Sequence, residues 1–243
     1  MIPLAADNGC QFAGIYLQGW GEFPPYDLGA PDQAAQLRRL CAEHGVSIAV
    51  AEPFLLLPDT SLDSLMPNLR LCAELGVRAI NTLCYDPQAQ RRIDLLGALA
   101  ERAAQHGLDA MVELFSLSAI RTVEDAARLI EAIGNPRLRI NLDLLHLMRA
   151  GGSPADVATR AALIGHVQVS DGPLRIAEVQ RMLEASQERG LPGEGEFPLR
   201  ELIAAVPHDV PIATEIPSLK RRHQGVTPAQ WAATAVSAVR ALL

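Results

Sequence analysis

Polar side chains of the types used in acid–base and metal chemistry interrupt strongly apolar stretches of this sequence. Asp143 and His146 lie three residues apart in RINLDLLHLM. A run of Ile and Leu of this length is typical of a strand that is buried on both faces. A carboxylate there is unfavourable unless a metal ion or a hydrogen-bonded partner compensates it. Similar apolar surroundings in MVELF, HVQVSD and PIATEIP contain Glu113, Gln168 and Glu215.

The chain repeats a unit in which a helix, a glycine and a strand follow one another. Gly45, Gly76 and Gly107 are each 31 residues apart, and Gly134 and Gly165 have the same spacing. A glycine after a helix is the expected left-handed cap. A period near 30 residues with alternating strands and helices indicates βα units and a parallel sheet.

The repeat predicts strands near residues 13–18, 46–52, 78–83, 110–115, 138–144, 166–171 and 211–216. One helix per strand favours a closed α/β barrel of the TIM type over an open doubly wound sheet, because no Gly-rich phosphate motif follows a strand. A closed barrel has eight strands, so either the usual first strand is missing or a terminal piece fills its place. A missing strand would leave an open edge, which favours association into a homo-oligomer.

Composition narrows the class of protein. With 243 residues, 49% of them apolar, the chain is expected to form a single domain over residues 1–243. A net charge of −7 argues against nucleic acid as a partner. No apolar run is long enough to cross a membrane, and the N-terminus does not resemble a signal peptide. The four widely spaced cysteines are expected to be reduced, as in a cytoplasmic protein.

The polar residues fall where a barrel of this type performs chemistry, at the C-terminal ends of the strands. The period of two in a strand gives Glu113, Asp143, Gln168 and Glu215 the same inward direction. A single Glu in a barrel strand is more often a structural ion-pair partner, but four such oxygen-bearing side chains at one rim would repel one another without a cation. Three carboxylates and one amide suit a hard divalent ion, Mg²⁺ or Mn²⁺.

At these positions the sequence resembles the xylose-isomerase-like TIM barrel superfamily of sugar phosphate isomerases and epimerases, over most of the chain from about residue 9. The matching segments are VELF, LDLLH, HVQVSD, PGEGEFPL and TEIP. The resemblance implies one divalent metal ion held by Glu113, Asp143, Gln168 and Glu215. Many epimerases of this family have His where Gln168 stands, whereas members similar to hydroxypyruvate isomerase and 3-dehydroshikimate dehydratase have Gln.

The resemblance implies an enzyme that isomerises or epimerises a small sugar or keto acid by abstracting a proton next to a metal-bound carbonyl. Glu113 and Glu215 would remove and return the proton, and His146 would hydrogen-bond a substrate oxygen or shuttle its proton. Two residues are candidates for substrate binding. Glu52 would line the pocket or pair structurally, and Arg189 would hold a carboxylate or phosphate or form a loop salt bridge.

Two further segments are candidates for contact with a ligand. Trp20 and Phe23 would wall the pocket from the loop after the first strand. The basic cluster at residues 220–222 would meet an anionic group, although a short cluster of this kind is usually a solvated turn.

Other functions fit the same pattern. A lyase similar to 3-dehydroshikimate dehydratase would use the same metal and the same proton abstraction, and HVQVSDGPL and ERGLPGEGEFPL favour it. A non-catalytic barrel that lost its first strand would bind a sugar or a partner protein. A DNA-repair nuclease of the related endonuclease barrel fits poorly, because an acidic surface repels phosphates.

Overall fold

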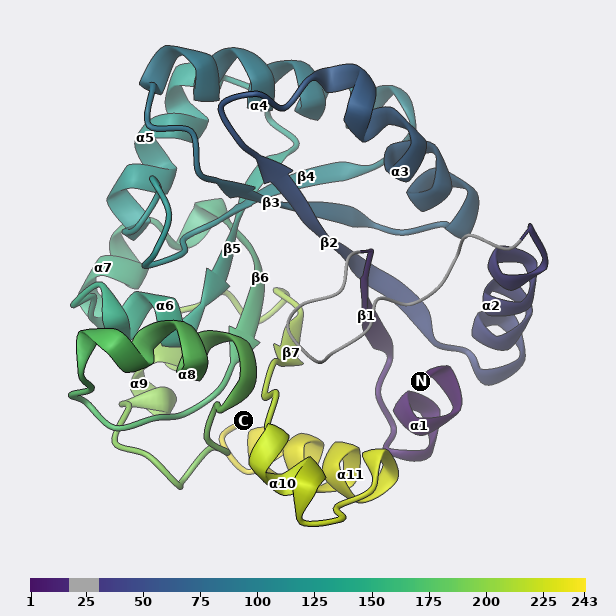
Figure 1. Ribbon diagram of the computed structural model, residues 1–243, viewed down its shortest axis with the longest axis vertical. Coiled ribbons are helices and arrows are strands. Elements are labelled where there is room, and N and C mark those ends of the chain that lie inside the picture. The colour runs from purple at the N-terminus through teal and green to yellow at the C-terminus, as the bar shows by residue number, and fades with distance from the viewer. Residues whose placement is uncertain (18–30) are drawn as a thin grey trace.

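The computed structural model describes residues 1–17 and 31–243, so Trp20 and Phe23 lie outside the described residues. Within the described part, seven parallel strands form one sheet in chain order, curved into a nearly closed barrel (Figure 1). The predicted TIM-type fold is confirmed. The strands are β1 (Phe12–Tyr16), β2 (Ser47–Leu56), β3 (Ala79–Cys84), β4 (Asp109–Glu113), β5 (Leu138–Asp143), β6 (Ile164–Val169) and β7 (Ile212–Thr214).

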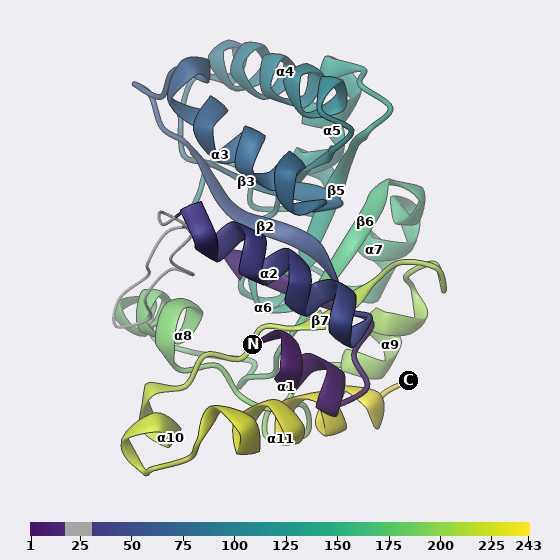
Figure 2. The ribbon, with the colours of Figure 1, turned by 90° about the vertical axis from the view of Figure 1, so that its right-hand side faces the viewer.

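Helices surround the sheet on its outside (Figures 1 and 2). None of the described helices is long and apolar enough to span a bilayer. The α-helices are α1 (Ile2–Asp7), α2 (Pro31–His44), α3 (Leu62–Leu75), α4 (Ala89–Gln105), α5 (Val123–Ile133), α6 (Leu144–Arg149), α7 (Pro154–Thr159), α8 (Arg181–Gln187), α9 (Leu199–Ala204), α10 (Leu219–His223) and α11 (Pro228–Arg240). Short 3₁₀ turns, η1 (Ala161–Leu163) and η2 (Glu178–Gln180), precede β6 and α8.

Local signals in the sequence account for several helix ends. Capping boxes begin α5, α7 and α11. Gly76 and Gly134 end α3 and α5 in the left-handed conformation, with φ of 69° and 70°. Gly165 is different, because it lies inside β6 rather than after a helix. A Cβ there would come within 2.7 Å of the Arg139 side chain on the neighbouring β5, so close packing explains this glycine.

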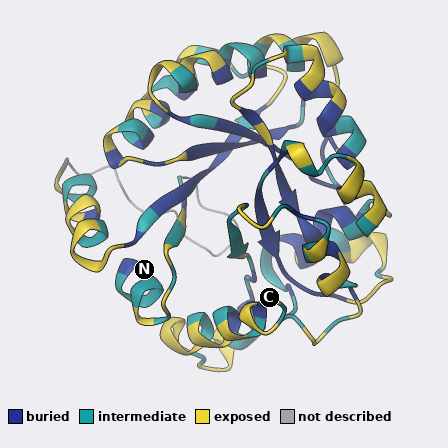
Figure 3. Cartoon of the chain, turned by 180° about the vertical axis from the view of Figure 1, so that it is seen from behind, coloured by how far each residue is buried: buried dark blue, intermediate teal, exposed yellow. Residues whose placement is uncertain are grey.

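The strands alternate between two environments. Apolar residues such as Val112, Ile140 and Val167 belong to the main hydrophobic core. The strands therefore lie buried at the centre of the molecule, and the exposed residues lie mainly on the outer faces of the helices (Figure 3). The alternate positions carry the polar residues Asn81, Glu113 and Asn141, all buried. A parallel sheet covered by helices has little room for such groups unless they bond to one another.

The barrel has a seam between its two edge strands. The sheet order begins with β1 and ends with β7, and no backbone ladder joins them in the described residues. Helix α1 packs against β1, α2 and α11, on the outside of the barrel next to this seam. Helix α1 thus lies beside the gap between β1 and β7, where a closed barrel would have its eighth strand.

Candidate active site

Five side chains from five successive strands form a closed ring of hydrogen bonds across the barrel interior, which we call the amide–carboxylate ring. Asn81 Nδ2 donates to Glu52 Oε2 at 2.8 Å and to Glu113 Oε2 at 2.5 Å. Asn141 Nδ2 donates to Glu113 Oε2 at 3.4 Å and to Gln168 Oε1 at 2.6 Å. Gln168 Nε2 closes the ring by donating to both oxygens of Glu52 at 3.2 Å.

The ring follows from strand register. Glu113 on β4 is paired with Asn141 on β5, and the next inward position of β5, Asp143, is paired with Gln168 on β6. His166 Nδ1 lies 3.0 Å from Asn141 Oδ1, which orients that amide. Each amide therefore offers its N–H groups to a neighbouring oxygen, and the buried carboxylates are partly satisfied.

Above this ring, a carboxylate–histidine cluster has the composition of a metal site. One ligand atom each of Glu113, Asp143 and His146 lies within 4.8 Å of the others. His146 Nε2 is buried and has no hydrogen-bond partner among the described residues. It lies 3.8 Å from Asp143 Oδ2 and 4.0 Å from Glu113 Oε1. Burial lowers the pKa of His146 to about 4. The imidazole is therefore neutral near pH 7 and forms no ion pair with these carboxylates there.

His146 is held from its other side. Ser116 Oγ lies 3.1 Å from Nδ1, and the Phe115 ring packs 4.0 Å from the imidazole, centroid to centroid. These contacts fix the plane of the imidazole and direct Nε2 towards the two carboxylates. An unsatisfied buried nitrogen facing two carboxylates fits a bound cation or a substrate oxygen at this point.

Asp143 has two structural partners. Its Oδ1 caps helix α6 by accepting from the backbone N–H groups of Leu145 and His146 at 2.8 and 3.2 Å. Its Oδ2 accepts from Arg189 Nη1 at 2.7 Å. Burial alone would raise the pKa of Asp143, but the Arg189 charge together with the other contacts of Asp143 outweighs it, and the net pKa lies below the usual value. Asp143 is therefore held as an ionised carboxylate.

Glu215 comes from the segment after β7 and meets the opposite edge strand. Tyr16 Oη donates to Glu215 Oε1 at 2.5 Å, across the seam. Glu215 Oε2 lies 3.4 Å from Arg189 Nη1 but has no hydrogen-bond partner among the described residues. Burial raises the pKa of Glu215 to about 8. Burial, reinforced by the Glu215 and Asp143 charges, also raises the pKa of Glu113 well above its usual value. A divalent cation would relieve this crowding of carboxylates.

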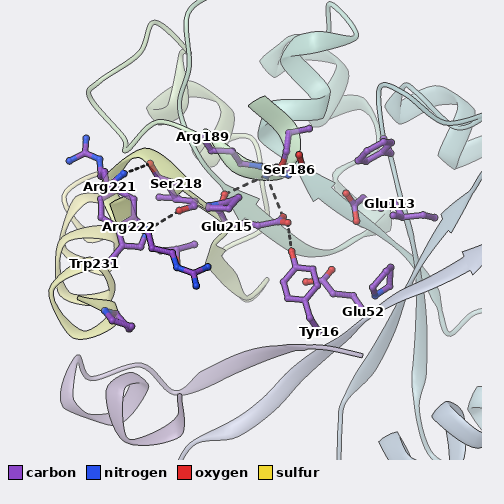
Figure 4. A pocket seen from close by; sticks show the side chains of 18 of the residues that line it. Tyr16, Glu52, Glu113, Ser186, Arg189, Glu215, Ser218, Arg221, Arg222 and Trp231 are labelled. Atoms are coloured by element: carbon purple, nitrogen blue, oxygen red, sulfur yellow. Dashed lines mark hydrogen bonds and ion pairs between the residues drawn. The ribbon is translucent and has the colours of Figure 1, made fainter. Parts of the chain in front are cut away.

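Three of these carboxylates, Glu52, Glu113 and Glu215, line a cavity of about 660 Å³ (Figure 4). Its lining comes from the strand ends, from α8 and from the segment that runs through α10 to α11. The residues are Tyr16, Glu52, Pro53, Leu83, Glu113, Phe115, Ala185, Ser186, Arg189, Thr214, Glu215, Ile216, Pro217, Ser218, Arg221, Arg222, Val226, Pro228 and Trp231. The size and shape suit a small molecule.

The structure gathers most of the predicted site residues, but not in equal roles. Glu113, Asp143 and His146 converge, and Arg189 links Asp143 to Glu215. Both groups of the Gln168 amide are engaged in the amide–carboxylate ring, so its contact with a metal ion stays a prediction. Glu52 both lines the cavity and pairs within that ring. Arg189 binds the interior carboxylate Asp143, and its contact with substrate likewise stays a prediction.

Three residues of the site were not predicted from the sequence. Tyr16 was the easiest of the three to find, because it is the last residue of the first strand. The sequence predicted that this strand ends two residues later, at residue 18. Asn81 alternates with the core residue Ile80 along β3, and that pattern places it on the opposite, inward face. Ser116 lies in the loop after β4, and no sequence signal connects it to His146.

The comparison with family models decides the classification. Residues 2–241 match the model described as xylose isomerase-like TIM barrel. The chain belongs to this family. Its structural relatives include the IolI protein with a bound zinc atom (TM-score 0.79, 16% identity, 99% of this chain and 91% of that chain). Another is D-psicose 3-epimerase from Clostridium cellulolyticum H10 (TM-score 0.77, 14% identity, 99% and 91%). At these identities the likeness is one of fold.

Two curated relatives of this chain are named as dehydratases. A 3-dehydroshikimate dehydratase of Pseudomonas aeruginosa is 30% identical over 225 residues, which cover 85% of this chain and 34% of that protein. Its counterpart in Pseudomonas putida is 28% identical over 197 residues, 74% of this chain and 30% of that protein. The chain thus spans about a third of the length of the curated relatives it matches. These relatives are enzymes, as are the epimerases of similar fold.

Proposed function

We propose that this protein is a divalent-metal-dependent lyase that removes water from a small cyclic keto acid of the 3-dehydroshikimate class. The observation that carries the proposal is the unsatisfied His146 Nε2, which faces Asp143 and the cavity-lining residue Glu113. Sequence similarity to two 3-dehydroshikimate dehydratases over most of the chain supports the choice of reaction.

The residues fit a bound divalent ion. Glu113 and Asp143 would hold it, with Gln168 and Glu215 as the further oxygen donors from neighbouring strand ends. Oxygen donors favour Mn²⁺ or Mg²⁺. When bound, such an ion supplies Lewis-acid polarisation of a carbonyl oxygen.

The protein's own groups would move the protons. Glu113 and Glu215 face each other across the inner end of the cavity (Figure 4). Glu113 would take the proton from the carbon next to the carbonyl. The carbon–oxygen bond of the departing hydroxyl then breaks, and Glu215 would supply the proton that lets it leave as water.

Tyr16, Ser116 and Arg189 would orient these groups. Tyr16 holds Oε1 of Glu215, and Oε2 lies 3.4 Å from Arg189 Nη1, so both carboxylate oxygens are kept in place. If Ser116 Oγ donates to Nδ1 of His146, Nε2 carries the proton and would donate it in a hydrogen bond to a substrate oxygen. Arg189 keeps Asp143 ionised.

A second candidate is the isomerase or epimerase of a small sugar. Its support is the pair Glu113 and Glu215, which face each other as epimerisation requires if one removes a proton and the other returns it (Figure 4). D-psicose 3-epimerase has a similar fold. The two candidates share proton abstraction and differ in whether water is lost.

Product analysis separates the candidates. Purified protein supplied with Mn²⁺ is incubated with 3-dehydroshikimate, and formation of the aromatic acid protocatechuate is followed by ultraviolet absorbance and chromatography. We expect protocatechuate to form, and to stop forming when a chelator is added. Conversion of ketoses without any protocatechuate would establish the isomerase instead. Bound Mn²⁺ with no turnover of either class would contradict both and favour a non-catalytic barrel.

A further inference from the structure

The two ends of the cavity carry side chains of opposite charge. Glu52, Glu113 and Glu215 line the inner end, at the ends of the strands. Arg221 and Arg222, on α10, line the outer end. Figure 4 shows the two arginines on the side of the cavity away from Glu113, with Glu215 between them. A ligand in this cavity would therefore meet carboxylates at one end and guanidinium groups at the other.

Internal contacts hold the outer end in place. Arg221 forms an ion pair with Glu194 of the PGEGEF loop, and its guanidinium lies 4.8 Å from the centroid of the Trp231 ring. Trp231 Nε1 donates to the Ile216 carbonyl at 2.8 Å. Arg221 and Trp231 thus form a wall that is tied to both neighbouring segments, and cation–π stacking contributes to it.

Helix α10 is anchored at its start as well. Ser218 Oγ caps it by accepting from the Arg221 backbone N–H, and Glu188 accepts from Ser218 Oγ at 3.2 Å and from the Lys220 backbone N–H at 2.7 Å. These bonds connect α10 to the end of α8, which lines the same cavity. The position of Arg222 relative to the strand ends is therefore set by tertiary contacts.

We propose that Arg222 binds the carboxylate of the substrate and is the residue that selects an acid over a neutral sugar. Its guanidinium reaches towards the open part of the cavity in Figure 4, opposite Glu113. A guanidinium offers paired N–H groups that match a planar carboxylate. Apolar walls from Ile216, Pro217 and Pro228 suit the flat carbon ring between the two ends.

This inference rests on the proposed function and adds an orientation to it. A keto acid would place its oxygenated carbons among the inner carboxylates, where a cation is expected, and its carboxylate at α10. The reverse orientation would move the substrate carboxylate away from the guanidinium groups of α10. The positive charge of the outer end thus favours the first orientation.

Two ligands that differ only in the carboxylate test the proposal without turnover. Protocatechuate is catechol with a carboxylate group, and calorimetry would measure the binding of each to Mn²⁺-loaded protein. We expect the wild type to bind protocatechuate at least about tenfold more tightly than catechol. Arg222→Ala should lose that preference while its affinity for catechol stays the same. Arg222→Gln should behave like Arg222→Ala, and Arg222→Lys should keep part of the preference.

Lys220→Ala is the matched control, because Lys220 is an exposed cation of the same helix that does not line the cavity. It should leave both affinities unchanged, and all variants should keep the wild-type melting temperature and Mn²⁺ content. Equal binding of the two ligands by the wild type, or an unchanged preference in the folded Arg222 variants, would overturn the proposal. The preference does not depend on dehydration. Protocatechuate formation without a role for Arg222 would thus refute this inference alone, whereas an Arg222-dependent preference without dehydration would refute only the lyase.

Discussion

The amide–carboxylate ring and the seam between β1 and β7 hold their carboxylates in different ways. In the ring, Glu52 and Glu113 accept hydrogen bonds from side chains on strands that are already joined by backbone ladders. At the seam, the hydrogen bond from Tyr16 to Glu215 spans two strands that no ladder joins in the described residues. Glu215 is also more exposed than Glu113, with side-chain exposures of 16% and 7%.

This difference indicates a division of tasks. Backbone register fixes the ring, so its residues are expected to matter for stability as well as for chemistry. The seam depends on side chains alone, so its residues can be changed at little cost to folding. Substitutions in the ring should therefore lower stability, whereas substitutions at the seam should lower activity with little loss of stability.

Removing the acid–base function at the seam should give the largest effect. Glu215→Gln keeps the size of the side chain and should keep the fold, but it should lower kcat by about a thousandfold or more, because one proton-transfer group is lost. The measurement is steady-state turnover of 3-dehydroshikimate beside a thermal melt. An unchanged rate would remove Glu215 from the mechanism. Glu113→Gln should lower kcat to a similar degree.

Removing a member of the amide–carboxylate ring should lower the free energy of unfolding. Asn81→Ala takes away the donor shared by Glu52 and Glu113 and leaves two buried carboxylates with fewer partners. The free energy of unfolding should fall by about 1–3 kcal/mol, as measured by urea denaturation. Asn68→Ala on helix α3 is the control and should have little effect, because the Asn68 side chain makes no hydrogen bond among the described contacts. Equal stability of the two variants would show that the ring is dispensable.

The burial of His166 should appear as a pH dependence of the free energy of unfolding. Burial lowers the pKa of His166 to about 4, below the 6.5 of an exposed imidazole. Between these values the unfolded chain binds the proton and the folded chain does not, so stability is lost as the pH falls. The slope for one such group approaches about 1.4 kcal/mol per pH unit.

Denaturation of chelator-treated protein from pH 7 to pH 4.5 would measure this slope. Glu215 contributes with the opposite sign, because its raised pKa makes the folded state bind the proton. The comparison of His166→Gln with the wild type isolates the histidine, since the other groups are present in both. We expect the variant to show a smaller loss of stability towards low pH. Identical curves would mean that His166 is not held neutral by burial.

The smallest effect is expected for Tyr16→Phe. The change removes a hydrogen bond at the seam, and the cost in stability should be about 1 kcal/mol or less. Turnover should fall by roughly tenfold, because Glu215 loses the group that orients it. Melting temperature and kcat, measured on the same variant, test whether the seam contributes to activity more than to stability. A stability loss larger than that of Asn81→Ala would contradict it.

The sequence by itself determined the features that depend on neighbouring residues. The period of two along each strand established that Asn141 and Asp143 share a face, and the spacing of glycines established the repeat of helix and strand. Capping signals such as Thr122 and Asp125 act within one turn and were visible without a structure. Placement of Glu113 and Glu215 at strand ends followed from the same local patterns.

Only the tertiary structure decided which of these groups meet. Arg189 and Asp143 are 46 residues apart, and Tyr16 and Glu215 are 199 apart, yet each pair is hydrogen-bonded. The same holds for Arg222, which lines the cavity with Glu113 although its cluster was indistinguishable in sequence from a solvated turn. Such contacts depend on the curvature of the sheet and on where the connecting segments return. Local propensities constrain neither of these, because they act over a few residues while the barrel closes over the whole chain.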